Sequence, residues 1–577
     1  MKKIIIRREA LAQSLAEVDL PPLLKKVFAN RGITAVEQIE HSLEHLLSYR
    51  TLKGIEQAVA CLYEALQLRQ HILILGDFDA DGATSSALAV SALQAFGAEK
   101  VSFLVPNRFE YGYGLTPEIV RVAAARNPHM LVTVDNGISS IEGVAEAKAL
   151  GMKVVITDHH LAGQALPQAD AIVNPNQPGD GFASKNLAGV GVIFYVMLAL
   201  RAHLRQMAWY QQRHIPEPNM AEYLDLVALG TVADVVPLDH NNRILVQQGM
   251  TRIKTGKVRP GIQALITVAQ RHNARLTATD LGFAVAPRLN AAGRLEDMAL
   301  GIECLLCPDL SRAQQMARRL DELNKERREI EKQMQQQAVL ALSHLQLQQD
   351  LPLGVCLYQQ DWHQGVIGIV ASRMKDRLHR PVIAFAQTSA DEIKGSARSV
   401  PGVHIRDVLD AIAKQQPQLI CKFGGHAMAA GLSIRLTDYP AFADAFAQEV
   451  VKHLAVEDLQ NRILSDGELD LAHFRVEIAD LLRNASPWGQ SFPEPIFDNY
   501  FTLIEQHIVG GKHLKMLLSL PGNKQAFFDA IAFNVDVERW PNHRVQNIHA
   551  AFRLDVNEFR GQRNLQLIIE DLLEVSA

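Results

Sequence analysis

From about residue 70 to residue 240, short apolar runs alternate with alanine-rich segments that have the polarity pattern of helices. Strand-like runs that alternate with helical patterns predict βαβ units and a mainly parallel sheet. We therefore expect an α/β fold for this part of the chain. The runs are HILIL (71–75), VSFLV (101–105), MLVTV (130–134), KVVIT (153–157) and AIVN (171–174).

The segment between Pro308 and Pro352 contains neither glycine nor proline and is rich in helix-forming residues. Small and apolar side chains recur on one face from Leu310 to Leu323, which predicts one long helix or two. A coiled-coil dimer is an alternative, but the heptad pattern breaks at residues 324–329. We therefore favour a helix that connects two domains, and we expect a monomer.

Two further patterns follow this helix. Residues 353–455 alternate apolar strands with helices, which predicts a second, smaller α/β domain. From Phe497 the runs have period two, which is typical of a small antiparallel barrel. The predicted parts are an N-terminal segment (1–45), a parallel-sheet domain (46–305), a connecting helix (306–350), the second α/β domain (351–455) and a C-terminal domain that contains the barrel (456–577).

Composition narrows the class of protein. The chain has 577 residues, 48% of them hydrophobic and 21% charged, which is ordinary for a soluble enzyme of several domains. The longest apolar stretch, residues 188–200, is shorter than the roughly 20 residues of a membrane-spanning helix. The N-terminus lacks a signal-peptide cleavage site. We expect a cytoplasmic protein without a membrane role.

The net charge and the cysteines add little to the prediction of function. A net charge of −5 means that any nucleic-acid binding must come from a local groove. The five cysteines form no disulfide framework. Cys304 and Cys307 form a CxxC without a second pair at zinc spacing, so we interpret them as apolar-face residues of a helix.

Three carboxylates, Asp77, Asp79 and Asp81, follow the first apolar run on alternate positions. With Gly82 they match the opening of an EF-hand loop. That match fails because Leu88 stands where a bidentate Glu is required and because a strand precedes the loop. An exposed acidic turn is a second alternative, but it leaves the polar residues after the other runs unexplained.

Those other runs also end in polar residues: Asn107 with Arg108, Asp135, and the triplet 158–160. In open parallel sheets the carboxyl ends of the strands form the binding site, so these side chains should converge. Clustered carboxylates repel one another unless a cation neutralises them, and two Mg²⁺ or Mn²⁺ ions can flank a phosphoryl group. The candidate ligands are Asp77, Asp79, Asp81, Asp135, His159, His160 and Asp234.

Adjacent side chains at a strand end point to opposite sides, so His159 and His160 should not bind one ion together. We assign His159 to the metal. His160 is then expected to hydrogen-bond the phosphate or the developing oxyanion.

The ordered motifs GDFDADG, VDNG, TDHH and GTVADVVPL resemble those of the DHH phosphoesterase superfamily. APRLNAAGRLED, DWHQGVIGIVASR, KGSARS and FGGHAMAAG extend the resemblance through a DHHA1-type second domain, and the whole chain resembles the single-strand-specific DNA exonucleases of that superfamily. The resemblance implies hydrolysis of single-stranded DNA from its 5′ end to mononucleotides, in recombination and repair. It also implies that the C-terminal barrel domain (456–577) is an OB-like nucleic-acid-binding domain. It places the metal ligands at Asp79, Asp81, Asp135, His159 and Asp234, with Asp77 and His160 as the surrounding catalytic residues.

A nuclease must also hold a polyanion, and arginines and tyrosines near the motifs suit phosphate contact and base stacking. Solvated surface charge is the alternative for each of them. The glycines around His363 and His426 suit close approach of phosphate or close helix packing, and the resemblance favours the former. The candidate substrate-binding residues are Arg108, Tyr111, Tyr113, Arg288, Asn290, Arg294, His363, Ser396, Arg398 and His426.

Two other functions are weighed against this one. An oligoribonuclease or pyrophosphatase of the same superfamily would need only the two α/β domains. A non-catalytic nucleic-acid scaffold should lack metal ligands, and here every expected position is filled. The partners that the resemblance implies are single-stranded DNA, a single-stranded DNA-binding protein and a helicase.

Overall fold

The computed structural model describes residues 4–9, 15, 17–107, 110–111, 114–348, 351–454, 462–523, 525–559 and 561–575, without the side chains of 344–348 and 559. Contacts divide the chain into two compact units. The larger contains residues 5–321 and 464–577, and the smaller contains residues 1–4 and 322–463. No helix in the described part of the chain is both long and apolar enough to cross a membrane.

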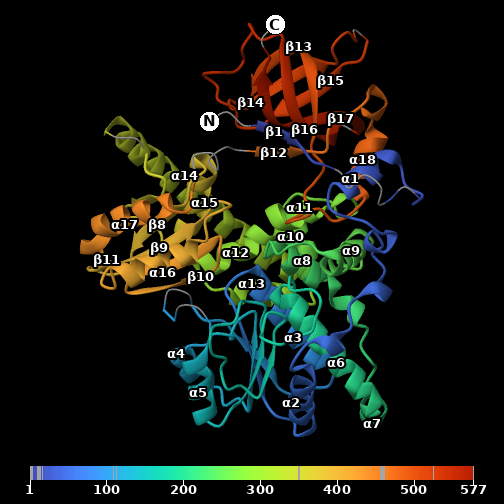
Figure 1. The fold of residues 1–577 in the computed structure, drawn as a ribbon. Coiled ribbons are helices and arrows are strands. Elements are labelled where there is room, and N and C mark those ends of the chain that lie inside the picture. Colours follow the sequence, from blue (N-terminus) through green and yellow to red (C-terminus); the bar gives the residue numbers. More distant parts are fainter. Residues whose placement is uncertain are drawn as a thin grey trace. The chain divides into compact units, whose positions relative to one another are not determined.

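A five-stranded sheet forms the centre of the larger unit's first half (Figure 1). Its strand order is β3-β2-β4-β5-β6, and every neighbouring pair is parallel, which confirms the predicted parallel sheet. Each strand coincides with one of the apolar runs. The strands are β2 (Ile72–Gly76), β3 (Val101–Leu104), β4 (Met130–Val134), β5 (Lys153–Thr157) and β6 (Ala171–Val173).

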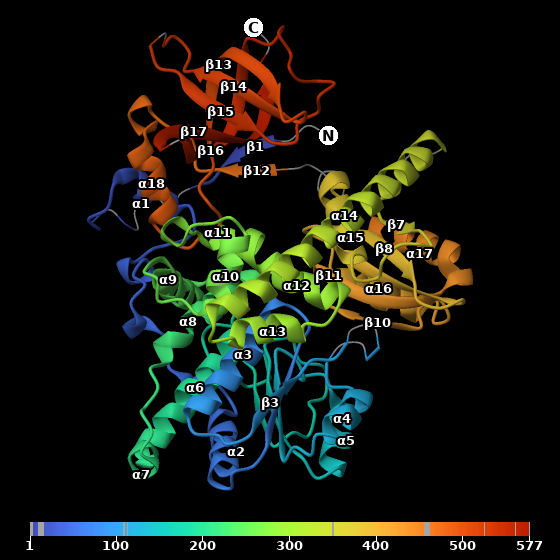
Figure 2. The same cartoon turned by 180° about the vertical axis from the view of Figure 1, so that it is seen from behind.

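Helices cover both faces of this sheet, as Figures 1 and 2 show. On one face Leu73, Leu131 and Val154 pack against side chains of α4 and α5 in a continuous buried cluster. Contacts of α2, α3 and α6 with the sheet mark the other face. Because both faces are covered, the strands are almost wholly apolar. The helices are α2 (Ile55–Gln67), α3 (Ala80–Ala95), α4 (Pro117–Ala124), α5 (Ile141–Ala149) and α6 (Gly189–Gln206).

Most of the other helices of the larger unit follow the sheet along the chain, whereas α1 precedes it. Cys304 lies on the buried face of α13, as predicted, whereas Cys307 is the C-cap residue directly after this helix and is also buried. The helices are α1 (Pro22–Ala29), α7 (Trp209–Arg213), α8 (Leu224–Ala233), α9 (His240–Lys254), α10 (Pro260–Val268), α11 (Ala278–Asp280), the π-helical turn η6 (Leu281–Val285), α12 (Ala286–Leu295) and α13 (Ala299–Leu306).

The C-terminal strands close a barrel in the order β13-β14-β15-β17-β16. The prediction of an antiparallel barrel is correct for all but one pair, since β15 and β17 are parallel. A closed barrel of five strands needs at least one parallel pair, because strand directions cannot alternate all the way around an odd number of strands. The period-two pattern along the chain does not reveal which pair it is. The elements are α18 (Val476–Asn484), β13 (Phe497–Val509), β14 (His513–Ser519), β15 (Phe528–Ala532), β16 (Asn547–Phe559) and β17 (Gln562–Glu574).

The smaller unit is a mixed sheet with helices. The single helix α14 (Leu310–Gln348) runs from one unit into the other, as the absence of Gly and Pro predicts. The sheet order is β10-β11-β9-β8-β7, and only β7 and β8 are parallel to each other. The elements are β7 (Val355–Tyr358), α15 (Ile367–Leu378), β8 (Val382–Gln387), β9 (Glu392–Arg398), α16 (Ile405–Gln415), β10 (Lys422–Gly425), β11 (Ala429–Arg435) and α17 (Tyr439–Val451).

Candidate metal centre

The loop between β2 and α3 and the first turn of α3 bring the first three carboxylates to the edge of the sheet. Asp79 is the N-cap of α3, and its Oδ1 accepts hydrogen bonds from the backbone N–H of Asp81 at 2.9 Å and of Gly82 at 3.0 Å. Aspartate is a favoured residue at this position because it satisfies otherwise free donors of the first turn. A Cβ on Gly82 would lie 2.5 Å from the carbonyl oxygen of Asp77, so the tight turn requires glycine.

Asp81 joins two helices. Its Oδ2 accepts a hydrogen bond from the backbone N–H of Gly189 at 2.6 Å, and its Oδ1 accepts one from Val190 at 2.9 Å, at the start of α6. A helix N-terminus stabilises a carboxylate through its free donors and its dipole. A Cβ on Gly189 would lie 2.5 Å from the Cβ of Asp135. Glycine at this position therefore lets α6 approach two carboxylates at once.

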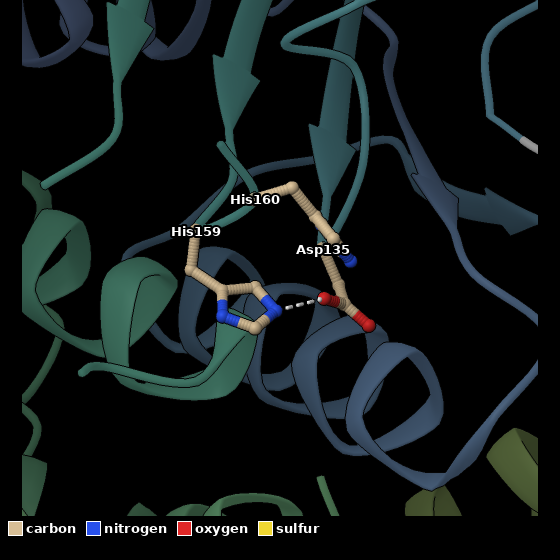
Figure 3. Close-up of side chains that lie close together, drawn as sticks. All are labelled: Asp135, His159 and His160. Carbon is tan, nitrogen blue, oxygen red and sulfur yellow. Dashed lines mark ion pairs between the residues drawn. The ribbon is translucent and has the colours of Figure 1, made fainter. Parts of the chain in front are cut away.

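Asp135, His159 and Asp234 meet although they come from distant segments. His159 Nε2 lies 3.1 Å from Asp135 Oδ1, as drawn in Figure 3, and 3.5 Å from Asp234 Oδ2. Asp135 follows β4 and His159 lies two residues after β5, so these strand ends converge as predicted. Asp234 reaches the same place from the C-terminus of α8, because its apolar run is a buried helix and not a strand.

All seven predicted ligands take part in possible metal sites. Three groups of side chains offer one ligand atom each, and within a group these atoms lie within 4.8 Å of one another. Asp135 and His159 each belong to two groups, which fits a pair of neighbouring ions. The groups are Asp135 with His159 and His160; Asp81 with His159 and Asp234; and Asp77 with Asp79 and Asp135.

The two histidines do not point to opposite sides, which corrects one expectation. Their ring centroids are 4.5 Å apart, and both rings belong to one candidate group with Asp135. The strand β5 ends at Thr157, so the alternation of a pleated strand no longer applies at residues 159 and 160.

Asp158 holds His160 in place. Its Oδ1 lies 2.7 Å from His160 Nδ1 and also accepts the backbone N–H of His159 at 2.7 Å, while its Oδ2 accepts that of Ile138 at 2.9 Å. Burial by itself would raise the pKa of Asp158, but the charge and hydrogen bond of His160 outweigh it and lower this pKa to about 2. Burial opposes protonation of His160, yet Asp158 raises the pKa of His160 to about 9.

The pKa values of the other carboxylates are shifted in the opposite direction, upward. Burial, followed by the charge of Asp234, raises the pKa of Asp81 to about 7. Burial, followed by the charge of Asp79, raises the pKa of Asp234 to about 7. The pKa of Asp135 is raised well above its ordinary value by burial and then by the charge of Asp81. Protein groups alone do not compensate this concentration of negative charge.

The unsatisfied atoms fit a divalent cation. His159 Nε2 and Asp234 Oδ2 are buried, and neither forms a hydrogen bond with any residue that the structure describes. Buried polar atoms are normally satisfied, so such a pair of acceptors facing each other indicates a ligand. Carboxylate oxygens with imidazole nitrogen are suitable ligands for Mn²⁺ or Mg²⁺.

Backbone strain accompanies two of these positions. Asp135 has φ +64°, and Val235, directly after Asp234, has φ +61°. The left-handed region is an outlier for a β-branched residue, and such strain concentrates at functional sites.

Sequence reasoning missed the residues that support the histidine loop. The side-chain amide of Asn174 donates to the carbonyl oxygen of His160 at 2.9 Å, and that of Asn176 donates to His159 at 2.6 Å. Both follow β6, so the polar end of the AIVN run was an available signal. Asp158 was also not assigned a role, although it is part of the triplet.

The predicted substrate-binding residues of the larger unit occupy different environments. Arg288 is buried, and its Nε donates to Asp321 Oδ1 at 2.9 Å. Asn290 Oδ1 accepts the backbone N–H of Ala80 at 2.7 Å, which ties α12 to the start of α3. Arg294 is half-buried near the end of α12. The structure therefore gives Arg288 and Asn290 packing contacts within the protein.

Near the end of β3, Tyr111 packs against the buried cluster on one face of the sheet. Its backbone N–H donates to Asn107 at 2.9 Å. Arg108 and Tyr113 lie outside the described residues.

In the smaller unit Ser396, Arg398 and His363 lie near the start of α15, and His426 lies between β10 and β11. Arg398 and Ser396 lie on β9, and Arg398 donates to Ser396 Oγ at 3.1 Å. A Cβ on Gly368, in the first turn of α15, would lie 2.9 Å from the guanidinium of Arg398. His363 lies four residues before this helix and accepts the N–H of Gly365 at 3.1 Å. His426 donates its backbone N–H to Ala429, which pairs with Arg398.

Three family models match consecutive parts of the chain. The DHH family N-terminal domain matches residues 71–231, the DHHA1 domain matches residues 351–452 and the RecJ OB domain matches residues 465–571. A parallel sheet with this acidic and histidine-bearing edge, followed by a DHHA1 domain, defines a DHH-family protein. The resemblance of the motifs is thereby confirmed.

Comparison with whole proteins is more specific. The chain is 52% identical to the single-stranded-DNA-specific exonuclease RecJ of Salmonella typhimurium and 51% identical to that of Escherichia coli, with 98% of both chains covered in each case. The chain belongs to the RecJ family. The crystal structure of RecJ from Thermus thermophilus in complex with Mn²⁺ matches 100% of this chain and 80% of that one, with a TM-score of 0.80 and 28% identity. The Mg²⁺ complex has a TM-score of 0.75 and 26% identity, over 100% of this chain and 78% of that one.

Proposed function

We propose that this protein is a metal-dependent exonuclease that hydrolyses single-stranded DNA from the 5′ end to 5′-mononucleotides, in recombination and repair. The observation that carries the proposal is the meeting of buried carboxylates with His159 at the carboxyl edge of the sheet, in a chain of the RecJ family. The names of the relatives and the metals in the Thermus thermophilus structures support the substrate and the cofactor.

In this proposal Asp79, Asp81, Asp135, His159 and Asp234 would hold two Mn²⁺ or Mg²⁺ ions, and Asp77 would support them. When bound, such ions polarise the phosphoryl group and make an attacking water more acidic. The carboxylate oxygens and the acceptor nitrogen of His159 position the ions. Their negative charge also prevents the phosphate from entering unless cations are present.

His160 has a separate role. Asp158 fixes its Nδ1, so that the other ring nitrogen can donate to a phosphate oxygen. The raised pKa of His160 keeps the ring protonated near neutral pH, and a cation beside a developing oxyanion stabilises it.

The remaining assignments extend this proposal. Residues of the DHHA1 domain, including Arg398 and Ser396, and Arg108, Tyr111 and Arg294 of the DHH domain would contact the strand. The domain limits 46–305, 351–455 and 456–577 remain predictions and are part of this proposal. We further propose a cytoplasmic monomer that works with a single-stranded DNA-binding protein and a helicase.

One assay tests the activity and its direction. The protein is incubated with 5′-labelled and 3′-labelled DNA, single-stranded and blunt duplex, with Mg²⁺, Mn²⁺ or EDTA. We expect immediate release of the 5′ label as mononucleotide, delayed loss of the 3′ label, resistance of blunt duplex and no reaction in EDTA. Early release of the 3′ label would contradict the polarity. Comparable cleavage of short RNA or pyrophosphate would favour the alternative enzymes, and inactivity on every substrate would favour a scaffold.

The 5′ end requires a recognition residue of its own, because metals treat all phosphodiesters alike. A guanidinium with a hydroxyl suits a phosphate monoester, and Arg398 with Ser396 offers both. Arg398→Ala removes a charge-assisted contact of roughly 1.5 to 3 kcal/mol. Binding of 5′-phosphorylated strands should therefore weaken about 10- to 150-fold. Unchanged discrimination between 5′-phosphate and 5′-hydroxyl ends would move the pocket elsewhere.

A further inference from the structure

Phe283 is the most exposed of the large hydrophobic residues in the described part of the chain, with 78% of its surface accessible. It lies in the π-helical turn η6, where the backbone N–H of Ala286 donates to the carbonyl of Leu281. Such turns are rare and occur frequently at functional sites. An aromatic ring held in solvent on an uncommon backbone turn needs an explanation.

The turn lies beside the helix that carries a proposed metal ligand. A Cβ on Gly282 would lie 3.1 Å from Val232 Cγ1, two residues before Asp234 at the end of α8. Because Gly282 has no side chain, the turn packs closely against this helix. Phe283 therefore lies on a turn that packs against the helix ending at Asp234.

Phe283 also begins a stripe that leads to the acidic loop. From residue 283 to residue 294 the accessible positions are Phe283, Pro287, Asn290 and Arg294, and every position between them is buried. Spacings of four, three and four place these residues on one face of a helix. The turn η6 is followed directly by α12, which is labelled in Figure 2.

The far end of the stripe touches the metal-bearing loop. Asn290 binds the backbone N–H of Ala80, and a Cβ on Gly293 would lie 1.8 Å from the carbonyl oxygen of Phe78. A helical rise of 1.5 Å per residue puts Phe283 about 10 Å along the axis from Asn290. The stripe therefore presents an aromatic ring, a proline, an amide and a guanidinium in this order, and it ends beside Asp77 and Asp79.

We propose that Phe283 stacks on a nucleobase of the single strand, a few nucleotides from the scissile bond, and so fixes the position of the strand in the site. The proposal rests on the proposed nuclease function and deepens it. A nucleobase is the occupant that the position favours, since the substrate strand must extend away from the metal centre and unpaired bases expose their faces. An unpaired base can stack on one aromatic ring, whereas a paired base in a duplex is already stacked on both faces.

The test separates stacking from simple apolar contact. Phe283→Ala should raise the KM for single-stranded DNA about 5- to 150-fold, the range for loss of one base–aromatic stack, with kcat unchanged. Phe283→Trp should restore KM, and Phe283→Leu should not. Leu68→Ala is the matched control, because Leu68 is 60% exposed at the end of α2. It should leave KM as it is. Equal melting temperatures of all variants check the fold.

An abasic scan locates the contact. Strands that lack one base at each position in turn are compared on the wild-type protein and on Phe283→Ala. We expect one position at which removal of the base raises the wild-type KM and adds no further effect in Phe283→Ala. If Phe283→Ala leaves KM unchanged, or if the two effects multiply at every position, the inference is wrong and the nuclease function stands. If the wild-type protein digests no single strand, the proposed function fails first.

Discussion

The larger unit contains two sets of buried carboxylates with opposite surroundings. At the edge of the parallel sheet, Asp81, Asp135 and Asp234 lie near one another, and burial with mutual repulsion raises their pKa values. Asp466, which precedes the barrel, and Asp498, which lies in its strand β13, are as deeply buried, but each faces an arginine. The first set is arranged to bind metal ions, whereas each carboxylate of the second set is already paired with the guanidinium of an arginine.

The barrel carboxylates have their partners within the protein. Asp466 accepts hydrogen bonds from both terminal nitrogens of Arg31, at 2.9 and 3.0 Å, and from Asn30 at 2.8 Å. Asp498 accepts from Arg7 Nε at 3.0 Å and from its NH2 at 2.8 Å. The pair of Asp466 is costly to break, because Arg31 is buried and would keep an uncompensated charge, whereas Arg7 is half-exposed and can be solvated. Loss of an acidic residue should therefore harm activity at the first set and stability at the second.

The largest expected effect belongs to Asp135→Asn. Loss of a charged metal ligand should lower exonuclease turnover about 10⁴-fold, or about 5.4 kcal/mol at 1.36 kcal/mol per decade. The melting temperature in EDTA should stay the same or rise, because the change removes a repelling buried charge. Turnover and melting are measured on the same preparation. Near-normal turnover would refute the assignment of Asp135.

The reverse pattern is expected for Asp466→Ala. Arg31, only 1% exposed, would lose its carboxylate, which should cost about 3 to 5 kcal/mol in the free energy of unfolding. Protein that remains folded should keep its turnover at the sheet-edge site. Urea unfolding measures the change. Glu99→Ala, which breaks the exposed pair with Arg69, is the control and should change stability by less than about 1 kcal/mol.

Added Mn²⁺ should stabilise the first set only. An ion that binds the native state at 100 times its Kd adds about 2.7 kcal/mol to the free energy of unfolding. We expect a rise in melting temperature with Mn²⁺ for the wild-type protein and for Asp498→Asn, and little rise for Asp135→Asn. Equal shifts in all three proteins would mean that the cation binds elsewhere.

The smallest effect concerns acid stability. Burial alone would raise the pKa of Asp498, but hydrogen bonds from Arg7, Ser465 and His549 outweigh it and lower this pKa. A lowered folded-state pKa gives stability that is present above the unfolded-state pKa of about 3.9 and is lost as pH falls through the folded-state value. Urea midpoints between pH 6 and pH 3 should therefore fall less steeply for Asp498→Asn than for the wild-type protein. Parallel curves would contradict this role of Asp498.

Local patterns were sufficient to predict the sheet, since its strands are apolar runs and the residues after β2, β4 and β5 are acidic or histidine. Contacts between segments that are distant in sequence were harder to predict. Whether Asp234 ends a strand or a helix cannot be decided from a short apolar run, because both are buried. The partners of Asp81 at the start of α6 are backbone groups, and the sequence carries no side-chain signal for them. The ion pairs of Asp466 and Asp498 join residues more than 400 positions apart, so no local pattern could indicate them.

The metal-site residues come from four segments between Asp77 and Asp234, and this wide spacing affects how the protein folds. A parallel sheet forms slowly because distant segments must meet before any contact stabilises them. Apart from Asp77, Asp79 and Asp81, which are close in sequence, the unfolded chain holds these ligands too far apart to chelate one ion, so cations cannot assemble the complete site in the early steps. Ions that bind only after the sheet has closed would slow unfolding more than they speed folding. They would act on the lifetime of the native state and hardly on the rate at which it is reached.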